Sequence, residues 1–277
     1  MIRRSFIMAA IAAGIATTVP MAGATAQEKS TWTAIRERGT IRIGVAQAEP
    51  YAFKDPLSKE WSGIAVSYGN NVAKALNVKP EFVEVTWGTA VAALQSNKID
   101  IMPNLSVTPE RAVTIEYTNM PISFSALSVL VPKNSKIENW QDMNKSDITV
   151  GVNQGSSQDG FVTERLPKAK ILRFGSYAEV IAAYQNGNIN VAAMYFPTLI
   201  LLAEKAGDAK VVIPKPTQHQ FSDVGIRRET DKTLRDWLAT VNLYFYNLGM
   251  PQTWYEEFLV KRGIDPKRSP AIIKEQW

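Results

Sequence analysis

The chain has 277 residues, of which 45% are hydrophobic and 21% are charged, a composition typical of a globular protein with one large domain or two small ones. It contains no cysteine and a single histidine, His219, so the sequence excludes disulfide bonds, thiolate metal sites and a zinc site built from histidines. The formal net charge of +5 falls to +3 without Arg3 and Arg4, and the other basic residues are scattered, which argues against a nucleic-acid partner.

The first 26 residues differ from the rest of the chain. Arg3 and Arg4 precede an apolar run at 6–18, and the small residues at 24–26 offer a cleavage site. This pattern predicts a secretory signal peptide over residues 1–26. A membrane anchor is the alternative, but the apolar run is shorter than the roughly 20 residues that a membrane span needs. Because no cysteine follows the predicted cleavage site, we expect a periplasmic protein without a lipid anchor.

Strands and helices alternate along the rest of the chain. Strands are predicted at 41–45, 81–85, 99–102, 126–134, 148–152, 169–174 and 189–193. Helices are predicted at 64–76, from Trp87, at 137–143, from Tyr177, at 230–249 and at 252–261. In the long C-terminal helix, Thr230 is the expected N-cap and Gly249 the expected stop. This alternation predicts parallel sheets built from βαβ units.

Two parts of the chain repeat each other. The segment at 87–104 aligns without a gap with the segment at 177–194, so that Trp87 meets Tyr177 and Ile99 meets Ile189. Upstream of each copy, the strand at 41–49 resembles the one at 148–156. Chance similarity between amphipathic helices is the alternative, but it does not account for the matching strands. The repetition predicts an α/β fold with two similar lobes.

Polar side chains follow the carboxyl ends of the predicted strands, where open α/β sheets bind ligands. In the first lobe, Asn104, Ser106 and Arg111 follow the strand at 99–102, and Glu49 and Tyr51 follow the strand at 41–45. In the second lobe, the strand at 148–152 leads into Gly155-Ser156-Ser157, and the strand at 189–193 leads into Tyr195.

An arginine and a helix start in opposite lobes form a possible anion clamp. A guanidinium offers a planar fork to a carboxylate, and the free N–H groups and hydroxyls at Gly155-Ser156-Ser157 suit the same charge. Two ordinary alternatives stay open at this point. Arg111 can pair with Glu110 or Glu116 in solvent, and Ser156 can be a simple N-cap.

With these motifs in view, the chain resembles the bacterial extracellular solute-binding proteins of family 3, the periplasmic amino-acid-binding proteins of ABC importers. The resemblance is carried by "LQSNKIDIMPNLSVTPERA", "VGVNQGSS" and "FGSYAEVIAAYQNGNINV". It implies two α/β lobes joined by crossing strands at 126–131 and 219–227. Lobe 1 would comprise 27–125 with 222–277, and lobe 2 would comprise 126–221.

The resemblance also implies the roles of individual residues. Arg111, with Ser156 and Ser157 from the other lobe, would hold the ligand carboxylate. Ser106 and Asn104 would accept hydrogen bonds from the ligand amine, and Trp87 would pack on its side chain.

The chain departs from the family where an aspartate usually binds that amine, because Tyr195 stands there. Carboxylate capture is therefore better supported than ammonium capture, although Glu49 or Asp159 are candidates to replace the missing charge.

We therefore expect a solute-binding protein that captures a small carboxylate, an amino acid or a close analogue, and delivers it to an inner-membrane ABC permease. We expect a monomer that needs no cofactor or metal. Two other functions fit the same fold less well. A dehydratase of the cyclohexadienyl type would need a positioned acid or base, and a receptor's ligand domain would be tethered to a membrane.

Overall fold

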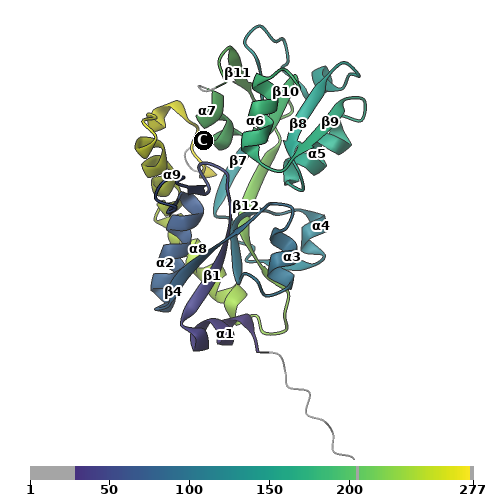
Figure 1. The fold of residues 1–277 in the computed structure, drawn as a ribbon. Coiled ribbons are helices and arrows are strands. Elements are labelled where there is room, and N and C mark those ends of the chain that lie inside the picture. Colours follow the sequence, from purple (N-terminus) through teal and green to yellow (C-terminus); the bar gives the residue numbers. More distant parts are fainter. Residues whose placement is uncertain (1–28, 204–205, 275–277) are drawn as a thin grey trace, which may run out of the picture.

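A computed structural model describes residues 29–203 and 206–274 (Figure 1). The predicted signal peptide lies outside these residues. The elements before the lobe crossing are α1 (Thr31–Arg38), β1 (Thr40–Ala46), β2 (Phe53–Lys54), β3 (Trp61–Ser62), α2 (Ile64–Leu76), β4 (Lys79–Val85), α3 (Ala90–Gln95), β5 (Ile101–Ser106), α4 (Pro109–Ala112) and β6 (Ile115–Tyr117). They are followed by β7 (Ser123–Pro132), a 3-10 turn (Trp140–Met143), β8 (Thr149–Asn153), α5 (Ser157–Arg165), β9 (Lys170–Phe174), α6 (Tyr177–Gln185), β10 (Val191–Tyr195), α7 (Phe196–Ala203), β11 (Ala209–Val212), β12 (His219–Arg227), α8 (Thr233–Asn247), α9 (Met250–Lys261) and a second 3-10 turn (Pro266–Arg268).

Two parallel sheet halves meet at two long antiparallel strands. The strand order is β4-β1-β5-β12-β7-β10-β8-β9, so β12 and β7 stand between the halves. The pairs β1–β4 and β1–β5 are parallel in the first lobe, and the pairs β8–β9 and β10–β8 are parallel in the second. Figure 1 shows β7 and β12 running between the lobes, side by side at the centre of the molecule. The predicted two-lobed α/β fold with two crossing strands is confirmed.

The internal repeat is visible in the backbone pairing of both lobes. In the first lobe, Asp100 Oδ2 accepts a hydrogen bond from Arg42 N at 2.7 Å, and Asp100 N donates to Arg42 O at 2.8 Å. In the second lobe, Asn190 Oδ1 accepts from Thr149 N at 2.8 Å, and Asn190 N donates to Thr149 O at 2.9 Å. These positions coincide in the sequence alignment of the two copies, so the same pair of hydrogen bonds joins the first strand of each lobe to its repeat strand.

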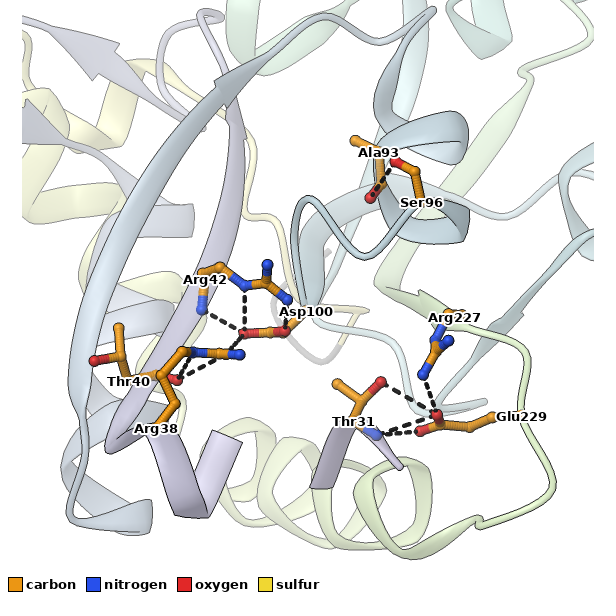
Figure 2. A network of polar contacts seen from close by, with 9 residues as sticks. All are labelled: Thr31, Arg38, Thr40, Arg42, Ala93, Ser96, Asp100, Arg227 and Glu229. Carbon is orange, nitrogen blue, oxygen red and sulfur yellow. Dashed lines mark hydrogen bonds and ion pairs between the residues drawn. The ribbon is translucent and has the colours of Figure 1, made fainter. Parts of the chain in front are cut away.

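The hydrogen-bonded pair of the first lobe carries charge, and the pair of the second lobe does not. Asp100 is buried, and its carboxylate binds the guanidinium groups of both Arg38 and Arg42 (Figure 2). A neighbouring ion pair joins Arg227 to Glu229, which also accepts from the backbone N–H of Thr31 at 3.1 Å. These contacts attach α1, β1 and the chain after β12 to one another.

The two C-terminal helices return to the first lobe and pack against α2 (Figure 1). Tyr68 of α2 makes edge-on contacts with the rings of Phe245 in α8 and Trp254 in α9. Its hydroxyl also donates to the buried Asn242 Oδ1 at 2.6 Å. Burial of these rings removes a large apolar area from water, which is the main source of stability for such a layer.

The predicted elements are mostly present, with corrected ends. Helix α2 has the predicted bounds, but α8 begins at Thr233 and not after an N-cap at Thr230. Asp231, the next residue, accepts from the Thr233 N–H at 2.9 Å and so satisfies the helix start that Thr230 was expected to satisfy. The strand predicted at 99–102 begins later and extends as far as Ser106. The elements α1, β2, β3, α4, β6, α7 and β11 were not predicted.

Candidate ligand-binding site

A cleft lies between the lobes at the carboxyl ends of their parallel strands, closed at the back by the crossing strands. The cavity between the lining atoms is narrow, with a volume of about 20 Å³. The lining residues are Tyr51, Trp87, Asn104, Ser106, Arg111, Ser125, Ser156, Ser157, Gln158, Tyr177, Tyr195, Gln220 and Ser222. The structure therefore brings eight of the nine predicted site residues into one cavity.

Arg111 bridges the two lobes. Thr108 caps the short helix α4, and its hydroxyl oxygen accepts from the Arg111 N–H at 3.3 Å. This bond fixes the backbone from which the Arg111 side chain extends. The guanidinium donates through Nη1 to Ser106 O at 2.9 Å and through Nη2 to Gly155 O in the second lobe at 3.1 Å. A guanidinium has five N–H donors, so these two contacts leave donors for a bound anion.

The start of α5 faces this arginine. Ser156 is the N-cap, and its hydroxyl donates to Asn153 O at 2.6 Å and accepts from the Asp159 N–H at 3.3 Å. The Gly155 N–H, expected to be free, donates to the Asp159 carboxylate at 3.1 Å. The anion-binding capacity of this segment therefore comes from the N–H groups of Ser157 and Gln158 in the first turn of α5, and from the Ser157 hydroxyl.

Gly155 also permits the lobes to touch. Its φ of +71° is a left-handed conformation that side chains disfavour, and a methyl group added there would lie 2.6 Å from the Cα of Gly88 in the other lobe. The backbones of the two lobes are thus in direct contact at the mouth of the cleft.

Three buried tyrosines also line the cleft. The hydroxyls of Tyr195 and Ser157 are 2.7 Å apart, and the Tyr177 hydroxyl accepts from Gln158 Nε2 at 2.6 Å. Burial raises the pKa of Tyr195, Tyr177 and Tyr51 above the ordinary value for tyrosine. All three are therefore neutral phenols at physiological pH.

Two polar atoms in the cleft are buried and have no hydrogen-bond partner among the described residues. They are the indole Nε1 of Trp87, a donor, and the Oδ1 of Asn104, an acceptor. Asn104 has a φ of +56°, an uncommon conformation for a residue other than glycine. Buried polar groups are normally paired, so both atoms are candidates for ligand contacts.

The structure does not bring Glu49 to the cleft. Its carboxylate pairs with Arg262 at 3.0 Å, and it is not one of the lining residues. Asp159, considered as a substitute charge, is also absent from the lining and pairs with Arg173 at 2.9 Å. Neither acid lines the cleft, and Asp159 instead lines an adjoining, more open pocket together with Arg111, Ser156 and Ser157.

Sequence reasoning missed five lining residues, namely Ser125, Gln158, Tyr177, Gln220 and Ser222. Two of them carried a signal. Tyr177 is the counterpart of Trp87 in the internal repeat, and Gln158 directly follows Gly155-Ser156-Ser157. The other three lie on the crossing strands, and their place in the cleft follows from the pairing of Ser222 with Ser123 and of Gln220 with Ser125.

Residues 41–256 match the family model described as bacterial extracellular solute-binding proteins, family 3. The chain belongs to this family. No helix in the described parts, 29–203 and 206–274, is long and apolar enough to cross a membrane.

Individual family members are moderately similar in sequence. The glutamine-binding protein of an ABC transporter in Bacillus subtilis is 30% identical over 165 residues, which cover 58% of this chain and 60% of that protein. The glutamine-binding protein of Geobacillus stearothermophilus is 28% identical over 179 residues, covering 63% of this chain and 66% of that protein. The chain thus spans less than two thirds of the length of either relative.

Solved structures agree over more of the chain. A structure described as an ancestral amino-acid-binding protein and precursor of cyclohexadienyl dehydratase aligns with a TM-score of 0.75 and 31% identity, covering 83% of this chain and 99% of the other. A solute receptor for L-cysteine of Neisseria gonorrhoeae aligns with a TM-score of 0.76 and 27% identity, covering 86% and 98%.

Proposed function

We propose that this chain is the periplasmic solute-binding protein of an ABC importer. It captures a small carboxylate, an amino acid or a close analogue, by closing its two lobes, and delivers it to an inner-membrane permease. In this proposal the mature chain is a monomer, lobe 1 comprises 27–125 with 222–277, and lobe 2 comprises 126–221. The relatives named as glutamine-binding and L-cysteine-binding proteins support an amino-acid-like ligand.

The observation that carries the proposal is the contact of Arg111 with both sides of the cleft. Its guanidinium reaches across from the first lobe to the carbonyl of Gly155, beside the α5 N-terminus. A carboxylate bound between the fork and that helix start would interact with both lobes only when they are closed. Ligand binding would then favour the closed form by its differential affinity for the two states.

A thermal-shift screen of the purified protein with amino acids, oxo acids and other small carboxylates tests this proposal. At a hundredfold excess over Kd, a ligand stabilises the folded state by about 2.7 kcal/mol, so a true ligand is easily detected. Arg111→Ala should lose most of this stabilisation, while Arg165→Ala, an exposed arginine at the far end of α5, should keep it. Full ligand stabilisation in Arg111→Ala would contradict the proposed role of Arg111 in holding the ligand carboxylate.

A dehydratase on the same fold has less support. Such chemistry needs a positioned acid or base. The residues that the structure places around the cleft include no aspartate, glutamate, histidine or lysine. The lining tyrosines have raised pKa values, which makes them poor general bases. Conversion of prephenate or arogenate by the purified protein would restore the enzymatic alternative.

A further inference from the structure

We infer that the ligand is a carboxylate whose other polar groups are uncharged, a 2-hydroxy or 2-oxo acid, and not a zwitterionic amino acid. This inference rests on the proposed function, because it takes the cleft as the ligand site. It selects the analogue class over the amino acids themselves.

The charge of the cleft supports an anion that carries no cation. Arg111 is the single formally charged side chain among the lining residues that the structure describes. A monoanion entering the closed cleft would be neutralised by this guanidinium. A zwitterion would bring an additional ammonium out of water with no carboxylate to meet it, and an uncompensated buried charge is strongly disfavoured.

The acids nearest the cleft elements are already engaged. Glu49 pairs with Arg262 at 3.0 Å, and Asp159 pairs with Arg173 at 2.9 Å while it also accepts from the backbone of the α5 start. Asp223, on the crossing strand β12, is fully buried and accepts from a threonine hydroxyl and from the next backbone N–H. None of the three lines the cavity. Glu49 and Asp159 would each have to leave an ion pair to reach an ammonium, and the unpartnered Oδ2 of Asp223 is buried outside the lining of the cleft.

The hydroxyls of Tyr195 and Ser157, at the second-lobe side of the cleft, carry no charge. Tyr195 occupies the end of β10 and shares a 2.7 Å hydrogen bond with Ser157. Burial raises the pKa of Tyr195, so it does not ionise to meet a cation. Its oxygen can orient a ligand by hydrogen bonding, but it provides no net charge.

The two unpartnered atoms favour a group that both donates and accepts. Trp87 Nε1 requires an acceptor, and Asn104 Oδ1 requires a donor. A ligand hydroxyl can satisfy both atoms, and an oxo group can satisfy the indole. An ammonium has donors only, so it cannot accept a hydrogen bond from Trp87 Nε1. The only acceptor left on an amino acid's backbone atoms would be the carboxylate, which Arg111 already holds in the proposed complex.

Isothermal titration calorimetry with matched ligand sets tests the inference. The sets are L-lactate, pyruvate and L-alanine, and L-phenyllactate, phenylpyruvate and L-phenylalanine. Within each set the side chain is constant and the group at C2 changes. We expect the tightest hydroxy or oxo acid to bind at least 10-fold more tightly than its amino counterpart, and Arg111→Ala to abolish that binding.

A pair of variants isolates the charge at the end of β10. Tyr195→Asp supplies a carboxylate, and Tyr195→Asn has the same shape without charge. We expect the preference for the amino acid to rise at least 10-fold in Tyr195→Asp relative to Tyr195→Asn. Thermal unfolding of both variants checks that they fold, and the comparison on the unmodified protein does not depend on them.

The possible outcomes separate the two claims. If the amino acid binds most tightly and its binding depends on Arg111, the inference is wrong and the proposed function stands. If no member of the panel binds, or binding survives in Arg111→Ala, both the inference and the carboxylate clamp are refuted.

Discussion

Gly155 lies where the lobes touch, and one added methyl group there tests whether this contact belongs to the ligand-binding state. In Gly155→Ala the new Cβ would be 2.6 Å from Gly88 Cα, whereas ordinary contacts begin near 3.4 Å. To restore an ordinary contact, the two backbones must separate by about 0.8 Å, the difference between those distances. The same movement stretches the hydrogen bond from Arg111 Nη2 to Gly155 O, now 3.1 Å, towards or beyond the limit of hydrogen bonding.

The expected loss in affinity follows from that bond. A hydrogen bond to a charged group contributes about 1.5–3 kcal/mol, which corresponds to roughly 10- to 150-fold in Kd. Gly155→Ala also places alanine at positive φ, which costs about 1–2 kcal/mol of stability whether the lobes are open or closed. Gly187→Ala is the matched control, because Gly187 has a φ of +70° and no atom within 4 Å of the added methyl group.

Two measurements separate these effects. Urea unfolding of the ligand-free proteins should show similar destabilisation in both variants. Calorimetry with the tightest member of the ligand panel should show weaker binding in Gly155→Ala alone, and small-angle scattering should show that this variant remains more open with ligand. Equal affinities in the two variants would refute the idea that ligand binding requires the Gly88–Gly155 contact.

Three further predictions concern stability. Burial raises the pKa of Asp223 from 3.8 to about 6, so the protonated carboxyl stabilises the fold fully below pH 3.8, and about 3 kcal/mol of unfolding free energy is lost as pH rises from 3.8 through 6. Urea unfolding between pH 4 and 7 should therefore show a flatter decline of stability in Asp223→Asn, and parallel curves for the two proteins would contradict this. Asp100→Asn removes the charge that two arginines share and should cost about 3 kcal/mol in the same assay; a loss below 1 kcal/mol would show that the arginines find other partners. Tyr68→Phe leaves Asn242 Oδ1 without its donor and should cost about 1–3 kcal/mol, whereas Tyr244→Phe at an exposed site should cost almost nothing; equal effects would contradict the role of the buried bond.

Periodicity in the sequence was sufficient for much of the fold. Helix α2 has an apolar stripe and a preceding glycine, and the structure gives it the predicted bounds. Helix α7 was missed because its sequence, "FPTLILLA", is apolar on nearly every side and so shows no helical period. The start of α8 was misplaced because Thr230 is of a good capping type, whereas the N-cap position is Lys232 and the Asp231 side chain accepts from the Thr233 N–H.

Some residues of the candidate site could be predicted from the sequence, and others could not. Arg111, Ser157 and Tyr195 follow the carboxyl ends of strands, so sequence order and the rule for α/β sheets were enough to nominate them. Ser222 reaches the cleft because β12 pairs with β7, a contact between segments about a hundred positions apart that no local pattern encodes. Glu49 follows a strand as the others do, but a tertiary ion pair with Arg262 holds it elsewhere.

The pair of hydrogen bonds that recurs in both lobes does not require charged side chains. The same backbone atoms are joined at Asp100 and Arg42 in one lobe and at Asn190 and Thr149 in the other. Unrelated lobes would have no reason to share this arrangement at aligned positions. Charges accompany these hydrogen bonds in the first lobe only, where Asp100 also binds Arg38 and Arg42. The neutral copy shows that the geometry was retained without an ion pair.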